Sequence, residues 1–134
     1  MSKANNTEND VLKMILQGTD PAYRAGANLF LALFTDDPTE TGSIADEATY
    51  TSYARVTLPK VSSWTDAGST FSNAALIQFP QCTGGSNLIT HVALITTASG
   101  AGQILYKGAL NSSLTVTNLI QPQFAIAALS ISED

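Results

Sequence analysis

The sequence predicts a mainly β protein: a single β-sandwich or barrel-like domain of about seven to eight short antiparallel strands with a short N-terminal helix. From residue 28 onward, short apolar runs stop at Gly, Pro or Asn, as strands commonly do. No long helical periodicity follows residue 20. The chain has 134 residues, enough for one domain with its own core. We therefore expect an N-terminal arm over residues 1–20 and a β domain over residues 21–134.

The arm is predicted to carry a short helix with one apolar face. Thr7 and Asp10 are spaced so that they can cap its first turn. Gly18 suits a left-handed residue at the helix end, and Pro21 prevents the helix from restarting. A helix of about ten residues is not stable alone in water, so this face is predicted to dock on its own domain or on a neighbouring subunit. The residues of the face are Val11, Leu12, Ile15 and Leu16.

The first predicted strand covers residues 29–34, an unbroken apolar run that indicates burial on both faces. Asp36-Asp37-Pro38 then predicts a turn. Residues 39–52 are polar and small, so they predict a long surface loop. Residues 53–58 alternate between apolar and other residues and stop at Pro59, which predicts a half-exposed strand.

The second half of the chain contains the strongest strand signal, at residues 88–95. Residues 64–68 indicate a turn, residues 81–87 a loop, and residues 99–102 the tight turn of a hairpin. Further strands are predicted at residues 70–73, 76–79, 103–107, 114–117 and 123–131.

Charge and composition exclude several classes of function. Only 13% of the residues are charged, and the balance of 6 Lys and Arg against 11 Asp and Glu gives a net charge of -5. Nucleic-acid binding needs clustered cations, whereas these are scattered singly, so no nucleic-acid partner is expected. One Cys and one His exclude a disulfide framework and the usual zinc sets. No apolar run approaches the ~18 residues of a membrane span, so no membrane partner is expected.

Two single residues are candidates for catalysis. His91 lies inside an apolar strand without a nucleophile-elbow motif, and we interpret it as a structural or interface histidine. Cys82 follows Pro80-Gln81 in a loop with no second Cys, which favours a small, unreactive thiol. We therefore predict no catalytic residue, and a protein that is not an enzyme.

Binding motifs for metals and phosphates are weak. Asp36-Asp37 and Asp46-Glu47 offer oxygen ligands for a hard cation, but their spacing differs from that of an EF-hand calcium loop. We interpret them as solvated loop residues. Gly84-Gly85 and Gly100–Gly102 lack the helix and lysine of a phosphate loop, so they indicate turns. No metal and no cofactor are expected.

Three aromatic residues support a rival function. Trp64, Tyr50 and Tyr53 would form a sugar-binding face if their rings stacked on a carbohydrate. The alternative is that Trp64 anchors the core or an interface, and we favour that interpretation. A carbohydrate-binding β-sandwich module is kept as a further alternative.

Several short motifs resemble those of small virion structural proteins of tailed bacteriophages, a group labelled tail-fibre proteins or capsid decoration (cement) proteins. The likeness covers nearly the whole chain, although residues 114–132 depart from the pattern. The motifs are residues 31–38 followed by Glu40 and Gly42, Tyr53-Ala54-Arg55, Phe71-Ser72-Asn73 with Phe79-Pro80, residues 90–94, and residues 102–110.

The resemblance implies a role in the virion, made in the host cytoplasm. The function it implies first is a capsid decoration or cement protein that binds the outer shell and stabilises it, with the major capsid protein or another virion protein as partner. The alternative is a tail-fibre or baseplate component that contacts the host. The capsid surface is the favoured location, and the tail is the second.

The composition independently favours self-association. Ala, Thr and Ser are abundant while Lys and Glu are scarce, so many outward positions are small and neutral. Such surfaces pack against copies of themselves at low desolvation cost. We expect a symmetric homo-oligomer, and the resemblance to decoration proteins implies a trimer. The predicted interface, for a subunit or for the capsid, is the helix face Val11, Leu12, Ile15 and Leu16.

Overall fold

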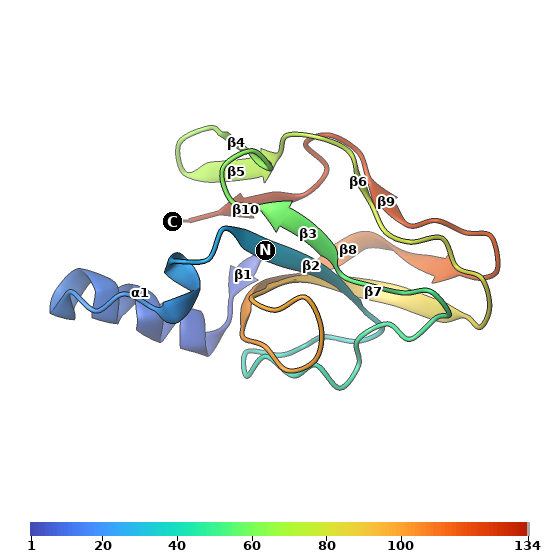
Figure 1. Ribbon diagram of the computed structural model, residues 1–134, viewed down its shortest axis with the longest axis horizontal. Helices are drawn as coiled ribbons and strands as arrows, with labels where there is room; N and C mark the ends of the chain where they lie inside the picture. Colours follow the sequence, from blue (N-terminus) through green and yellow to red (C-terminus); the bar gives the residue numbers. More distant parts are fainter. Residues whose placement is uncertain (134) are drawn as a thin grey trace.

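The computed structural model describes residues 1–133, so Asp134, the last residue of the predicted β domain, lies outside the described residues. Strands dominate the chain, and one α-helix lies near its start (Figure 1). The elements in chain order are β1 (Ser2–Lys3), α1 (Asn5–Gln17), the 3₁₀ turn η1 (Ala22–Arg24), β2 (Asn28–Phe34), β3 (Val56–Pro59), β4 (Trp64–Asp66), β5 (Thr70–Asn73), β6 (Ile77–Gln78), β7 (Asn87–Ile95), β8 (Ile104–Val116), β9 (Gln123–Phe124) and β10 (Ser130–Ser132).

The strands form three antiparallel sheets. The largest has the order β1-β8-β7-β2-β3, a second has the order β10-β5-β4, and β6 pairs with β9. The two smaller sheets lie over one face of the largest (Figure 1). The predicted fold class is thus confirmed: the protein is mainly β with a short N-terminal helix, built in residues 1–133 from ten short strands that close no barrel.

The centre of the large sheet explains its apolar runs. Residues 31–34 of β2 are all buried, and they pair in register with β7, where Leu33 lies opposite Val92. Side chains of successive strand residues point to opposite faces. Leu31 and Leu33 accordingly join the main core under the small sheets, while Ala32 and Phe34 join a second cluster. An unbroken apolar run is needed because both faces are covered.

Helix α1 begins earlier than predicted. Its N-cap is Ala4, with no side-chain cap, so the expected cap by Thr7 and Asp10 is wrong. Thr7 is instead buried, and its hydroxyl donates to the carbonyl oxygen of Ile104 at 3.4 Å. Ala4 is only 2% exposed, because β1 pairs with β8 and brings the chain onto the sheet. The predicted end is confirmed: Gly18 has φ 65°, a left-handed conformation that glycine adopts without strain.

One predicted strand and one predicted turn differ from the structure. The strand expected at residues 53–58 begins only at Val56, because Tyr53 and Arg55 contribute their side chains to a polar network. The turn expected at residues 64–68 begins as a strand, β4, which pairs with β5. In both places contacts with distant residues outweighed the local sequence signal.

The C-terminal third differs more. The strands expected at residues 103–107 and 114–117 are one strand, β8, whose pairing with β7 shifts register between Ile89 and His91. The strand expected at residues 123–131 is interrupted by a turn in which Ala127 has φ 63°. The buried side chain of Asn73 holds that turn: its Nδ2 donates to the carbonyl of Ala125, and its Oδ1 accepts from the N–H of Leu129.

Candidate docking surface

The predicted docking face lies on a helix that projects from one end of the molecule (Figure 1). Leu12, Ile15 and Leu16 are 56%, 70% and 76% exposed. Val11 is half-buried, because it turns toward the sheet. We call Leu12, Ile15 and Leu16 the outer face of α1. The structure therefore brings three of the four predicted residues together on an exposed surface and places the fourth on the inner side.

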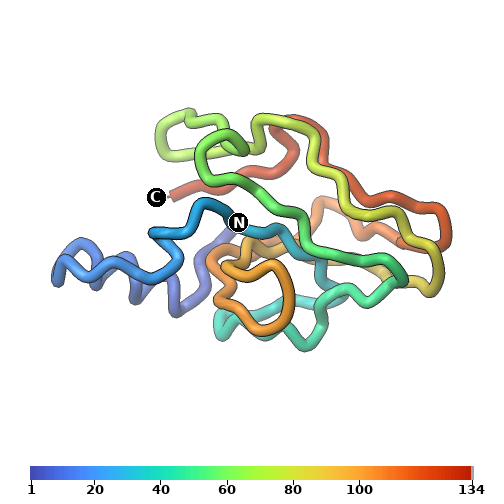
Figure 2. Tube along the Cα trace, in the orientation of Figure 1, coloured from blue at the N-terminus to red at the C-terminus, as the bar shows by residue number. Residues whose placement is uncertain are grey.

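Beneath α1 lies an open apolar groove of about 350 Å³, which we call the α1 groove. A second hollow of about 280 Å³ shares Leu94 and Tyr106 with it and extends to Trp64, Phe71 and Ile131. The chain leaves α1, turns back through η1 and enters β2 (Figure 2). The helix on one side of the groove and strand β2 on the other are therefore consecutive in sequence, joined by η1. The largest apolar side chains of the groove come from Val11, Met14, Leu29, Leu94, Leu105 and Tyr106.

Three charged residues, Asp10, Arg24 and Lys60, border this groove. The ammonium group of Lys60 donates to the carbonyl oxygens of Tyr23 and Arg24, and within residues 1–133 it forms no ion pair with a carboxylate. Burial, with Asp10 nearby, raises the pKa of Tyr23 to about 12, so its hydroxyl stays neutral. The carboxylate of Glu8, on the outer face of α1, is exposed and forms no hydrogen bond or ion pair in the described part of the chain. A cation and an anion are thus both available for a partner.

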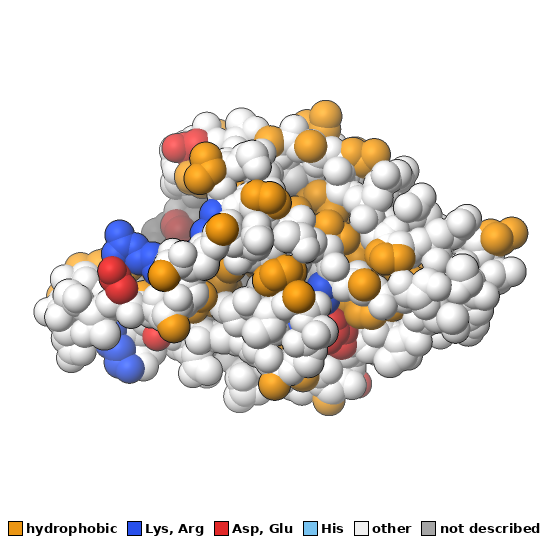
Figure 3. Space-filling view, in the orientation of Figure 1, with side chains coloured by type: hydrophobic (Ala, Val, Ile, Leu, Met, Phe, Trp, Pro, Cys, Tyr) orange, Lys and Arg blue, Asp and Glu red, His pale blue; other side chains and the backbone are white. Residues whose placement is uncertain are grey.

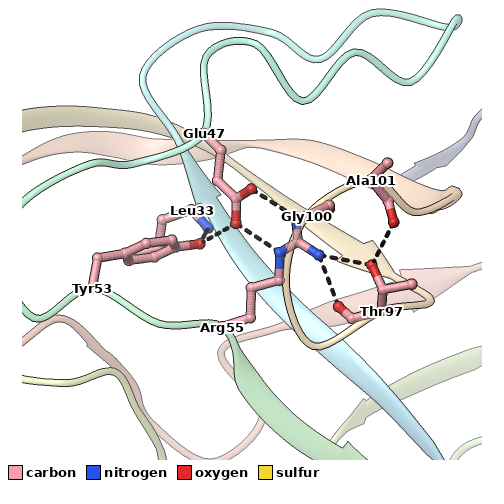
Figure 4. A network of polar contacts seen from close by, with 7 residues as sticks. All are labelled: Leu33, Glu47, Tyr53, Arg55, Thr97, Gly100 and Ala101. Atoms are coloured by element: carbon pink, nitrogen blue, oxygen red, sulfur yellow. Dashed lines mark hydrogen bonds and ion pairs between the residues drawn. The ribbon is translucent and has the colours of Figure 1, made fainter.

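A buried polar network, which we call the Arg55 clamp, joins the loop between β2 and β3 to the loop between β7 and β8 (Figure 4). Arg55 makes a bidentate pair with Glu47 through Nε and Nη2, both at 2.7 Å. Its Nη1 donates to the carbonyl oxygen and hydroxyl of Thr97 at 2.8 and 2.9 Å, and its Nη2 also donates to the carbonyl oxygen of Gly100 at 2.8 Å. Every N–H donor of the guanidinium therefore has an acceptor.

Tyr53 extends the clamp to the central strand β2. Its hydroxyl donates to Glu47 at 2.8 Å and accepts from the backbone N–H of Leu33 at 3.1 Å. Burial raises the pKa of Tyr53, and the hydrogen bonds from Arg55 to Glu47 raise the pKa of Arg55. Glu47 thus accepts hydrogen bonds from both Arg55 and Tyr53, and Tyr53 links the clamp to β2. The motif Tyr53-Ala54-Arg55 has a structural explanation.

His91 makes one hydrogen-bonding contact, which is local, and it also helps to lower the pKa of the Asp37 carboxyl. Its Nδ1 lies 2.8 Å from the hydroxyl of the preceding Thr90, and within residues 1–133 no carboxylate hydrogen-bonds the ring. The side chain is half-buried on β7, in register with Phe34 on one neighbouring strand and Ala109 on the other. The arrangement lacks the orienting acid of a catalytic triad.

Replacing His91 by Gln should change the free energy of unfolding by no more than about 1 kcal/mol, because a half-buried position with one local contact has little to lose. Thermal unfolding of the purified variant and of the wild type measures the difference. A loss of several kcal/mol would show that the ring has a further structural role, and a hydrolytic activity that the variant lacks would show a catalytic one.

Cys82 is fully buried, at 0% exposure. Its thiol donates to the carbonyl oxygen of Gly84 at 3.1 Å. Its backbone N–H donates to the carbonyl oxygen of Ile120, and its own carbonyl accepts from the N–H of Leu119, both at 2.8 Å. The residue therefore ties two loops together, and its burial keeps the thiol away from solvent.

The acidic loop residues Asp37, Glu40 and Glu47 form ion pairs in two separate places. Glu47 belongs to the Arg55 clamp, whereas Asp37 faces the ammonium of Lys107 at 3.1 Å, as does Glu40. A hydrogen bond from the backbone N–H of Thr39, together with Lys107, lowers the pKa of Asp37. Within residues 1–133, no three His, Cys, Asp or Glu side chains converge on a possible metal position.

The three aromatic residues of the sugar-binding alternative do not form one exposed face. Tyr50 is 3% exposed, and its hydroxyl donates to the carbonyl oxygen of Pro80. Its ring packs edge-on against Tyr53, with centroids 5.4 Å apart. Trp64 lies on β4, packs against the main core and borders the hollow beyond the α1 groove. The two tyrosines are structural, and Trp64 stands apart from them.

Neither the α1 groove with Lys60 nor the position of Glu8 on the outer face of α1 was identified from the sequence. Glu8 precedes Leu12 by four residues, so its place on the outer face was visible in the sequence. Lys60 and Leu94 carry no such signal, because they join α1 only through the pairing of β2 with β3 and β7.

Fold and surface together describe a small, mainly β structural module with a projecting apolar helix and buried networks that serve stability. Residues 2–132 match the family model of the podophage GP4 fiber I protein gp80, and the chain belongs to this family. It is therefore a fibre-type structural protein of a phage virion. This agrees with the predicted resemblance to virion structural proteins of tailed bacteriophages. No curated protein matches the chain. No helix within residues 1–133 is long and apolar enough to cross a membrane.

Proposed function

We propose that the chain is a non-enzymatic subunit of the phage fibre that assembles with copies of itself through the outer face of α1. One observation carries the proposal: in a member of a fibre-protein family, Leu12, Ile15 and Leu16 stay exposed on a projecting helix. Three large aliphatic side chains on adjacent helical turns are typical of a helix that docks on a partner. The oligomer we propose is the trimer that the resemblance implied.

The mechanism is non-covalent attachment by burial of apolar surface. Complete burial of one Leu or Ile side chain contributes about 1.5–3 kcal/mol. Three such side chains on each copy supply several kcal/mol before the cost of association is subtracted. An oligomer that presents several copies of one contact to the virion also gains from multivalency.

Attachment to the capsid as a decoration protein is the second candidate. Its support is the neutral surface: most of the face seen in Figure 3 carries neither acidic nor basic side chains, and many of those that show lie at the end that carries α1. Such a surface suits a protein that clamps shell subunits. The family match favours the fibre, so we place the fibre first.

Separating phage particles into heads and tails tests the location. We expect an antibody against the chain to detect it in the tail and fibre fraction, and to decorate fibres in electron micrographs of intact virions. Detection on the heads alone would replace the fibre by the decoration role. A chain that is absent from purified virions would contradict both.

Association should withstand salt. The outer face is apolar and the charge density is low, so ~1 M NaCl, which screens exposed charge pairs, should leave the oligomer intact. Sedimentation equilibrium at micromolar concentration in low and high salt measures this. Complete dissociation in high salt would show that charges hold the subunits together.

A further inference from the structure

We propose that the α1 groove is the receptor for the outer face of α1 from a second copy of the chain. The inference rests on the proposed function in one respect, namely that the chain acts as a multi-copy subunit. Leu12, Ile15 and Leu16 of one copy would enter the groove of the next. Because the face and the groove are different surfaces, every copy both donates and receives, and a ring of three copies can close.

The chemistry of the groove matches that of the face. Its volume of about 350 Å³ leaves room for several aliphatic side chains, and the hollow of about 280 Å³ lies next to it, across Leu94 and Tyr106. The walls are predominantly apolar, with Leu29, Leu94 and Leu105 from the sheet. Leu12, Ile15 and Leu16 have the i, i+3, i+4 spacing with which an amphipathic helix anchors in such a groove.

The outer face cannot fill the groove of its own chain. The inner side of the same helix, with Thr7, Val11 and Met14, already borders that groove. The start of α1 is also fixed in place, because Ala4 is 2% exposed and Thr7 is 4% exposed, both beneath the sheet edge formed by β1 and β8. Turning the outer face inward would expose these buried residues. The occupant must therefore come from another molecule.

Charge complementarity identifies that molecule as a second copy. Glu8 lies in line with Leu12 and Ile15, at i, i+4 and i+7, and its carboxylate has no partner in the described part of the chain. Lys60 lies in the groove wall, where backbone carbonyls alone accept from its ammonium. Docking of the apolar side chains brings a neighbour's Glu8 to the groove that contains Lys60. One sequence thus carries both halves of the contact.

Disulfide trapping tests the proposed contact in the full-length protein. The variants Ile15→Cys and Tyr23→Cys place thiols on the outer face and at the groove, while the native Cys82 is buried and should not react. We expect a disulfide between the two variants when they are mixed under mild oxidation. Lys13→Cys, on the polar side of α1, is the control that should not cross-link to Tyr23→Cys.

Two outcomes would overturn the docking. If Ile15→Cys links only to itself, the helices pair with one another and the groove is not the receptor. If no link forms while sedimentation still shows an oligomer, the subunits associate elsewhere, and the proposed fibre function survives. A wild-type monomer at micromolar concentration would instead overturn the self-assembly on which both proposals depend.

A charge-swap cycle provides the second test. Glu8→Lys and Lys60→Glu should each weaken association, and the double variant should recover it, because the pair is re-formed with its signs exchanged. Exposed pairs of this kind change an association constant about 2- to 5-fold. Circular dichroism checks that each variant is folded. Additive weakening in the folded double variant would contradict the placement of Glu8 beside Lys60.

Discussion

Replacing Arg55 by Ala is expected to lower the free energy of unfolding by about 3–5 kcal/mol. The side chain of Arg55 is 2% exposed, and its removal leaves the carboxylate of Glu47, itself only 17% exposed, without its cation. The carbonyl oxygens of Thr97 and Gly100 lose their donors as well. Breaking a buried pair costs more than the pair contributes, because the remaining charge stays desolvated.

Thermal or urea unfolding measures this effect. For a domain of this size the loss corresponds to a fall in Tm of about 10–20 °C. The matched control is Arg24→Ala, which removes an exposed ion pair with Asp20, four residues earlier in the chain, and should cost less than about 1 kcal/mol. Equal effects of the two substitutions would show that the Arg55 clamp does not hold the loops.

Replacing Asn73 by Ala is expected to cost about 2–4 kcal/mol. The side chain is buried, and its amide donates to the carbonyl oxygens of Ala75 and Ala125 while its oxygen accepts from the N–H of Leu129. The carbonyl of Ala75 and the N–H of Leu129 would lose the side-chain partner, while the carbonyl of Ala125 would keep only the N–H of Ala128. The turn between β9 and β10 would lose its side-chain attachment to β5 and keep only the backbone hydrogen bonds of residue 73 to Ala127 and Leu129.

Denaturant unfolding of this variant gives the free energy directly. Asn9→Ala, on the exposed side of α1, removes the same chemical group from a position without comparable contacts and is the control. Hydrogen exchange should in addition show faster exchange of the Leu129 amide in Asn73→Ala. Unchanged protection of that amide would contradict the assigned role of Asn73.

The sequence predicted elements whose signal is local. Residues 29–34 and 88–95 became the central strands β2 and β7, because long apolar runs suit strands that are covered on both faces. Gly18 marked the end of α1 through its own backbone conformation. The outer face of α1 was visible for the same reason, since helical spacing is a property of consecutive residues.

Features that depend on distant residues were missed. The alternation of residues 53–58 predicted a strand, yet Arg55 bonds to Thr97, which lies more than forty residues later in the chain. Asn73 interrupts the strand predicted at residues 123–131 by binding residues about fifty positions away. The α1 groove is likewise assembled from α1, β2, β7 and β8. No local pattern encodes such contacts, because they follow from strand pairing.

A cryo-EM map of the intact virion tests the central claim most directly. That claim is that the chain is a fibre subunit and that its helix α1 docks on a neighbouring copy. The map should place the chain in a fibre, with Leu12, Ile15 and Leu16 covered by the groove of an adjacent subunit. A fibre in which these three side chains face solvent, or a chain located on the capsid shell, would contradict it.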